Sequence, residues 1–201
     1  MSKNRIGLNA DKRGLPEDMK CKSLKTPVFI ETPRLMLKMP TLGDVQGVRD
    51  AWNLDGGHLS LAEATAQIER ILLNQEKNQM GTFVHLCLAI VQKCNGRIIG
   101  WCGIAHDDQT LACPVIFILL KKAYWRQGFA TEAGIYLLRF SFSELGLERV
   151  EGTCATENLA SKRVMEKIGM CYVGIDEAGA HLFRAERNEY LRDFGEQLAS
   201  N

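Results

Sequence analysis

The sequence predicts a single α/β domain with a mixed, mostly antiparallel sheet, and three observations lead to this class. Two β-rich runs flank Asn95-Gly96, a dipeptide that accepts the positive φ of a tight hairpin turn. The apolar run 111–120 is followed by a turn, an apolar helical pattern to residue 145 and another β-rich run, which favours a parallel crossover. A chain of 201 residues suits one domain with a substantial core.

The composition excludes several classes of protein. Hydrophobic residues make up 46% and charged residues 24%, as in soluble globular proteins, and a net charge of +1 argues against a general nucleic-acid binder. The seven cysteines include no C-x-x-C pair, so reduced thiols fit better than disulfides or a zinc site. The N-terminal twenty residues lack the apolar core of a signal peptide. We therefore expect a soluble cytoplasmic protein that binds no nucleic acid, no membrane and no metal.

Three segments are expected along the chain. Residues 1–26 mix charges, glycine and proline without periodicity, which is typical of a loosely ordered extension. Residues 27–194 carry the periodic apolar pattern of the folded domain, and residues 195–201 form a polar C-terminal tail.

The first part of the domain predicts one strand and two helices. Alternating apolar residues predict a strand within the run 29–39. Thr41 or Asp44 can cap the first helix. Ser60, with Glu63 three residues later, is a capping box that starts the second helix.

The remaining elements follow from apolar periodicity and from turn residues. The near-continuous apolar character of the three central strands implies that helices cover both faces of the sheet. The expected elements are antiparallel strands over 83–92, 97–105 and 111–120, a helix over 129–145, a strand over 149–155, a short helix from the Asn158 cap to Gly169, a strand over 170–175 and a last strand within 181–194.

The turn YWRQGFATEA (124–133) leads from an apolar strand into an apolar helix. A glycine at such a turn lets consecutive backbone N–H groups converge, and the helix N-terminus adds partial positive charge. Gly128 keeps bulk away from an anion, while Arg126 and two preceding lysines add charge. The pattern is neither a nucleoside-triphosphate P-loop nor G-x-G-x-x-G. It predicts a phosphate site, with an ordinary strand–helix turn bearing surface cations as the alternative.

Three segments, in order, resemble the GNAT superfamily of acyl-CoA-dependent N-acetyltransferases: T-P-R-L-M-L (32–37), W-R-Q-G-F-A-T-E-A (125–133) and E-N-L-A-S-K-R-V-M-E-K-I-G-M (157–170). Within it they are similar to the branch of ribosomal-protein N-terminal alanine and serine acetyltransferases. The similarity runs from about residue 30 to 175, and Trp125 stands where the superfamily loop has Gln or Arg, as is usual in this branch. It implies a GNAT-type sheet of about seven strands with about four helices, splayed between two central strands.

The resemblance also implies how acetyl-CoA is held. Backbone N–H groups of the turn would bind the CoA diphosphate, an exposed strand edge would pair with pantetheine, and the cap of the next helix would bond the pantetheine arm. That cap can equally be a purely structural feature, and the two roles can coexist. The implied cofactor-binding residues are Ile118, Leu119 and Leu120 on the strand, Arg126, Gln127, Gly128, Phe129, Ala130 and Thr131 in the turn, and Asn158, Ser161 and Arg163 at the following helix.

For catalysis, the resemblance implies direct transfer from acetyl-CoA to a primary amine, either a protein N-terminus or a small molecule, in a ternary complex. Ser161 corresponds to a serine near the CoA sulfur and can protonate the leaving thiolate. The candidate bases are His58, Glu151 and His181, although an α-amine with a pKa of about 8 needs little help. Cys154 is expected to pack in the core, because the family forms no covalent enzyme intermediate.

Two other functions remain open from the sequence. An acyl-CoA-binding regulatory protein without transferase activity would keep the same turn, and so would a phosphate-binding regulator unrelated to CoA. The family resemblance is compatible with a monomer or a homodimer.

Overall fold

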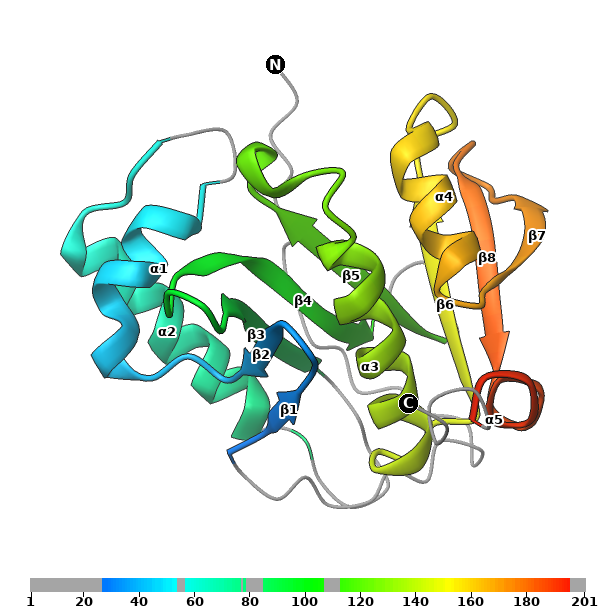
Figure 1. The fold of residues 1–201 in the computed structure, drawn as a ribbon, viewed down its shortest axis with the longest axis horizontal. Coiled ribbons are helices and arrows are strands. Elements are labelled where there is room, and N and C mark those ends of the chain that lie inside the picture. The colour runs from blue at the N-terminus through cyan, green and yellow to red at the C-terminus, as the bar shows by residue number, and fades with distance from the viewer. Residues whose placement is uncertain (1–26, 54–56, 77, 79–84, 107–112, 196–201) are drawn as a thin grey trace.

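The computed structural model describes residues 27–53, 57–76, 78, 85–106 and 113–195. The extension expected over 1–26 and all but the first residue of the expected C-terminal tail lie outside these residues. Within them, eight strands form a single sheet in the order β1-β2-β3-β4-β5-β6-β8-β7, with five α-helices (Figure 1).

The helices and strands occupy most of the described chain. The strands are β1 (Phe29–Glu31), β2 (Leu35–Lys38), β3 (His85–Gln92), β4 (Ile98–His106), β5 (Pro114–Leu120), β6 (Arg149–Cys154), β7 (Cys171–Ile175) and β8 (His181–Glu186). The helices are α1 (Val45–Ala51), α2 (Leu61–Glu76), α3 (Phe129–Ser143), α4 (Leu159–Lys167) and α5 (Arg187–Gly195), with short 3₁₀ segments η1 (Leu42–Asp44) and η2 (Lys122–Tyr124).

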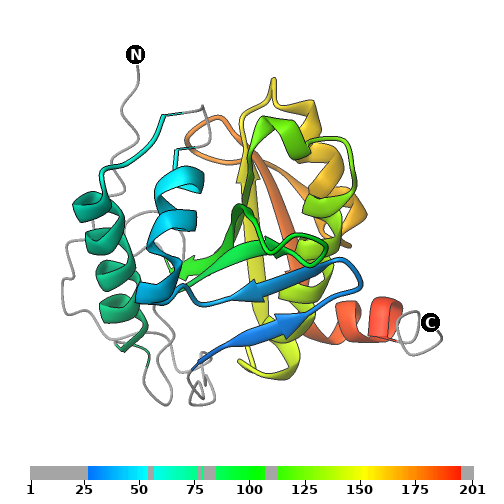
Figure 2. The ribbon, with the colours of Figure 1, turned by 60° about the vertical axis from the view of Figure 1, so that its left-hand side comes forward.

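Helices cover both faces of the sheet, as the apolar strands predict. Figure 2 shows α1 and α2 on one side and α3, α4 and α5 on the other. Alternate residues of β3 divide between two cores: Leu88 belongs to the core beneath α3 and α4, whereas Ala89 belongs to the core beneath α1 and α2. This division follows from the two-residue side-chain period of a strand.

Local turn chemistry produces the predicted meander of β3, β4 and β5. Gly96 has φ 67°, and its N–H donates to the Gln92 carbonyl at 2.9 Å, which closes the connection between β3 and β4. Both neighbouring pairs are antiparallel. The Ser60–Glu63 capping box at the start of α2 is also confirmed, with reciprocal bonds of 2.8 and 3.2 Å.

Two segments differ from the sequence-based expectation. The single strand expected within 29–39 is two antiparallel strands, β1 and β2, because Thr32 closes a turn by accepting the Leu35 N–H at 2.9 Å. The polar end of the last expected strand is instead helix α5. It is held there by Tyr190, which is buried against Phe142 of α3 with ring centroids 5.2 Å apart.

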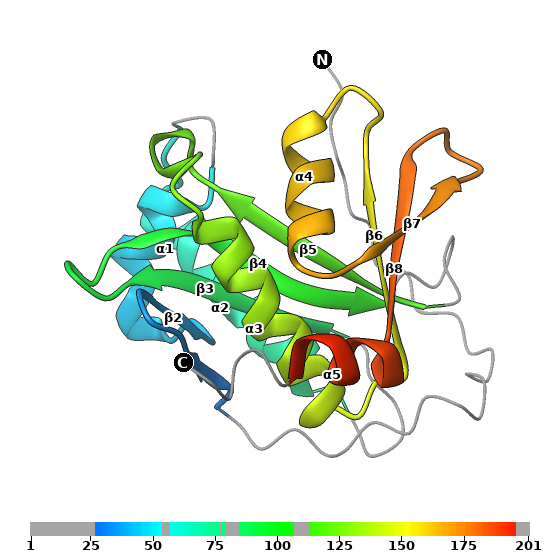
Figure 3. The ribbon, with the colours of Figure 1, turned by 45° about the vertical axis from the view of Figure 1, so that its right-hand side comes forward.

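The central strands diverge as the resemblance implies. Parallel pairing of β5 with β6, across the α3 crossover, is limited to Val115 opposite Glu151 in the described residues. Figures 1 and 3 show the two strands separating toward the end where the turn before α3 and the start of α4 lie. The fold class is therefore the expected mixed sheet, with one additional strand and one additional helix.

We predict that Gly103→Ala lowers the free energy of unfolding by about 1–3 kcal/mol, because the added methyl group would clash with the backbone of β3, which is fixed by the sheet. A Cβ at Gly103 would lie 1.9 Å from the Leu86 carbonyl oxygen and 2.5 Å from the Phe117 ring. Gly43→Ala is the control, since its Cβ would meet only Thr41 Oγ1 at 3.5 Å. Urea denaturation compares the two, and equal stability of both variants would contradict the close approach of β3, β4 and β5.

Candidate functional site

The turn before α3 has an unusual backbone. Arg126 has φ 60° and Gly128 has φ 80°, and Arg126 is the one non-glycine residue with positive φ in the described part of the chain. Left-handed residues in such a turn bring successive N–H groups to one side and form an anion-binding nest. A non-glycine residue held there is strained, and strain of this kind clusters at functional sites.

The amides of this turn are available to a ligand. Gly128 is the N-cap of α3, and the first four N–H groups of a helix have no intrahelical acceptor. Among the described residues, no group accepts a hydrogen bond from the N–H groups of residues 126–131. With the partial positive charge of the helix terminus, the turn can bind a diphosphate through its main chain.

The open edge of β5 lies beside this turn. The Lys121 N–H donates to the Ile99 carbonyl at 3.0 Å, and bonded pairs alternate along an antiparallel ladder. That alternation turns the backbone groups of Leu119 toward β4 and those of Ile118 and Leu120 toward β6. The Leu120 carbonyl accepts the Trp125 indole N–H at 2.8 Å, which secures the turn to the end of the strand.

A second helix N-terminus lies across the divergence from β5. Asn158 caps α4, and its side-chain oxygen accepts the Ser161 N–H at 3.1 Å, so the predicted cap is confirmed. Ser161 is half-buried in the first turn of α4, and Arg163 is exposed. The Lys162 ammonium lies 5.3 Å from the centroid of the Tyr172 ring.

The three candidate bases lie in different environments. His58 is 61% exposed, with Nδ1 3.4 Å from an oxygen of Asp50, in a connection whose residues 54–56 lie outside the described chain. His181 Nδ1 lies 3.3 Å from the Tyr172 hydroxyl. Within the described residues, no hydrogen bond or ion pair joins His58 to Glu151 or to Ser161.

Glu151 occupies the closed end of the divergence. Its carboxylate is 5% exposed, and one oxygen accepts two bonds from the Arg184 guanidinium, at 2.9 and 2.7 Å. Neighbouring β6 residues Val150 and Cys154 face the core beneath α3 and α4, so Glu151 faces the opposite side of the sheet. Burial raises the pKa of the Cys154 thiol despite the attraction of nearby Lys162, which suits packing rather than nucleophilic chemistry.

Three residues that the sequence does not single out, Thr32, Arg34 and Glu132, join the start of α3 to the N-terminal strands. The Glu132 carboxylate accepts bonds from the Thr32 hydroxyl at 2.6 Å and from Arg34 Nε at 2.6 Å. Burial raises the pKa of Glu132, but hydrogen bonds from Thr32 and Arg34 outweigh it and hold that pKa below its ordinary value. The only signal in the sequence was the presence of T-P-R and T-E-A within the family-like segments.

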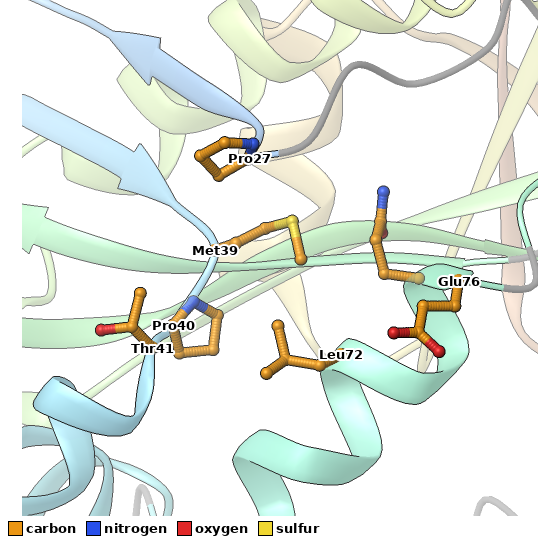
Figure 4. A pocket seen from close by; sticks show the side chains of 7 residues that line it. Pro27, Met39, Pro40, Thr41, Leu72 and Glu76 are labelled. Carbon is orange, nitrogen blue, oxygen red and sulfur yellow. The ribbon is translucent and has the colours of Figure 1, made fainter.

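A separate cavity of about 320 Å³ lies at the end of α2 (Figure 4). Its walls are mainly apolar, and none of its residues belongs to the turn before α3 or to α4. It is lined by Pro27, Met39, Pro40, Thr41, Leu72, Gln75 and Glu76.

The described residues contain no group of three or more His, Cys, Asp or Glu side chains arranged to hold a metal ion. None of the helices in these ranges combines the length and the apolar character that crossing a membrane requires.

The part of the chain that forms this site also matches a known protein family. The family model for the acetyltransferase (GNAT) domain matches residues 34–171, which include the turn, the divergent strands and α4. The chain belongs to the GNAT acetyltransferase family. The resemblance noted in the sequence is thereby confirmed.

Among curated relatives, the chain is 38% identical over 156 residues to the uncharacterized N-acetyltransferase YoaA of Bacillus subtilis, covering 73% of this chain and 85% of that one. It is 36% identical over 117 residues to FsC-acetyl coenzyme A-N(2)-transacetylase of Aspergillus fumigatus, covering 48% and 49%. For several relatives the chain spans only about half of the relative's own length, with coverage between 28% and 56%.

Among solved structures, the chain is similar to a ribosomal-protein-S5-alanine acetyltransferase from Vibrio fischeri, with a TM-score of 0.65, 13% identity, and 81% and 98% of the two chains covered. It is also similar to a GNAT-family acetyltransferase from Bacillus anthracis, with a TM-score of 0.60, 20% identity and coverage of 80% and 99%. At these identities the likeness shows the fold.

We predict that Glu132→Gln destabilises the protein at pH 7 and that the deficit shrinks in acid. A lowered carboxyl pKa contributes stability above the ordinary value of 4.5, and this contribution is lost as the pH falls through the folded-state pKa. Urea denaturation of wild type and variant at pH 7 and pH 3.5 measures the gap. Glu177→Gln, at an exposed position after β7, should show almost no gap. A Glu132→Gln gap that stays constant with pH would contradict the ionic contact.

Proposed function

We propose that the protein is an N-acetyltransferase that moves an acetyl group from acetyl-CoA to a primary amine, through a domain spanning residues 27–194. The observation that carries this proposal is the set of amides over residues 126–131 that have no acceptor in the described part of the chain, at the open end of the diverging β5 and β6. Family membership and the printed activity of the Aspergillus relative, which names acetyl coenzyme A, support it.

In this proposal the main chain holds the donor. The N–H groups from Arg126 to Thr131, including those of Gln127, Phe129 and Ala130, bind the CoA diphosphate. The backbone groups of Ile118 and the N–H of Leu120 face the gap left by β6 and pair with the pantetheine arm, and the side chain of Asn158 bonds that arm from the other wall.

The transfer itself needs an oxyanion donor and two proton movements. The amine nitrogen attacks the thioester carbonyl carbon, so a C–N bond forms and the C–S bond breaks. A backbone N–H on the β5 edge stabilises the developing oxyanion, a kind of donor whose loss typically costs about 3–4 kcal/mol. The Ser161 hydroxyl gives its proton to the departing thiolate and regains one from solvent. The proton of the nitrogen passes to water or to a carboxylate such as Glu151.

The acceptor approaches over the face of β5 and β6 opposite α3, where Glu151 lies. Arg184 binds one oxygen of Glu151, and His58 is exposed beside Asp50, so the proposal does not depend on either side chain as a dedicated base. An α-amine suits such a site, since about a third of it is neutral near pH 7.5, against about 0.1% of a lysine side chain. The acceptor class proposed is therefore a peptide N-terminus or a small molecule with an amine of similarly low pKa.

Two measurements on the purified protein test the function. Isothermal titration with CoA measures binding, and a thiol-release assay with acetyl-CoA measures transfer to short peptides with a free N-terminus and to matched peptides whose only amine is a lysine side chain. We expect CoA binding and faster release with the free N-terminus. Binding without release for any amine would favour an acyl-CoA-binding regulatory protein, and binding of nucleotides but not CoA would favour an unrelated phosphate-binding regulator.

We predict that Gly128→Glu weakens CoA binding at least 100-fold, because it places bulk and a negative charge among the amides of the turn. Gly179→Glu is a matched control, since Gly179 has nearly the same φ, 81°, and open space around its Cβ position. Titration calorimetry compares the two variants. Equal affinity of both would contradict the assignment of the turn to the diphosphate.

We predict that Ser161→Ala lowers kcat at least tenfold and changes the Kd of CoA less than threefold, since the hydroxyl acts on the leaving thiolate rather than in binding. Steady-state thiol release and calorimetry measure the two quantities. Ser143→Ala, at the end of α3, controls for the loss of a hydroxyl. Full activity of Ser161→Ala would remove the serine from the proton path.

A further inference from the structure

The carboxylate of Glu132 joins the connection between β1 and β2 to the start of α3. Glu132 lies in the first turn of α3, with its side chain 11% exposed. One oxygen accepts the Thr32 hydroxyl at 2.6 Å and the Arg34 backbone N–H at 2.8 Å, and the other accepts Arg34 Nε at 2.6 Å. Both donors belong to the connection between β1 and β2, about 100 residues earlier in the chain.

Arg34 continues from this carboxylate onto the turn itself. Its Nη1 donates to the Gln127 carbonyl at 3.0 Å, and its guanidinium carbon lies 4.5 Å from the centroid of the Phe129 ring. The position of a Cβ on Gly128 lies 3.3 Å from Arg34 Nη2. The guanidinium therefore contacts Gln127 and Phe129 and leaves little room for a side chain at Gly128.

The bond to Gln127 decides which way one amide points. In a trans peptide the C=O and the N–H lie on opposite sides of the chain. Because the Gln127 carbonyl points at Arg34, the N–H of Gly128 points away from Arg34, where no described group accepts it. Rotation of this peptide would put a carbonyl oxygen in the place of that N–H and repel an anion.

We propose that Thr32, Arg34 and Glu132 form a clamp that positions the turn for the diphosphate of the acyl donor, which makes the β1–β2 connection part of the donor site. This inference rests on the proposed function, because it needs a diphosphate ligand at residues 126–131. The clamp acts through the orientation of the turn amides. It holds this conformation of the turn, in which the non-glycine residue Arg126 is left-handed, before the ligand arrives.

The test compares a ligand that carries the diphosphate with one that lacks it. Calorimetry with CoA and NMR titration with pantetheine are run on wild type, Arg34→Met, Arg34→Lys and Glu132→Gln. The control is Lys93→Met, which removes an exposed ion pair to Glu31 of β1 with a 2.6 Å contact. We expect the Kd of CoA to rise at least tenfold in the three clamp variants, the Kd of pantetheine to stay within twofold, and the control to match wild type for both ligands.

The lysine variant separates charge from geometry. Lysine keeps the positive charge but lacks the fork that spans Glu132 and Gln127. Wild-type CoA affinity in Arg34→Lys would overturn the positioning role, and so would unchanged CoA affinity in Arg34→Met. Parallel losses for CoA and pantetheine would also overturn it, because they would mean general damage to the fold. If Arg34→Met does not fold, the volume-matched Glu132→Gln carries the same comparison.

The outcome distinguishes this inference from the proposed function. If wild type binds CoA no better than pantetheine, the diphosphate site fails and takes the clamp with it. If wild type prefers CoA and Gly128→Glu abolishes that preference while the clamp variants keep it, only the clamp is wrong.

Discussion

Strands β5 and β6 pair at Val115 and Glu151 and then separate, while each stays paired with its other neighbour. Antiparallel pairing with β4 holds β5 along its whole length, and antiparallel pairing with β8 holds β6 in the same way. Beyond this pair, the edge of β5 that faces β6 carries backbone donors and acceptors to which no described strand is paired. Such an edge is normally a liability in a sheet, and here the α3 turn and the start of α4 lie on either side of it (Figure 3).

The turn before α3 trades local stability for function. A left-handed arginine and a row of amides that no described group accepts are unfavourable unless the surroundings impose them. Three contacts impose them here: the Trp125 indole on the end of β5, the guanidinium of Arg34 on the turn, and the Glu132 carboxylate that holds that guanidinium. All three involve side chains, whereas the proposed ligand contacts are main-chain groups, so side chains set the shape and the backbone supplies the chemistry.

Features fixed by neighbouring residues could be predicted from the sequence. The β3–β4 connection follows from Asn95-Gly96, the start of α2 from Ser60 and Glu63, and the start of α4 from the Asn158 cap. Each of these depends on contacts within a few residues, which a single sequence displays.

Features that depend on distant partners could not be predicted. The contact of Thr32 with Glu132 joins residues 100 positions apart, and neither residue type signals it alone. Helix α5 could not be predicted for the same reason, since its position depends on the packing of Tyr190 against α3. The sequence offers Glu151 as a candidate base, but its ion pair with Arg184 depends on the pairing of β6 with β8, which the sequence does not display.

The central claim is that main-chain amides at the start of α3 bind the diphosphate of the donor. Titration of ¹⁵N-labelled protein with CoA tests it most directly, by following each backbone amide signal. The account predicts that the largest shifts and the slowest amide exchange in the complex fall on residues 126–131. Saturable CoA binding that leaves these amides unshifted would contradict it.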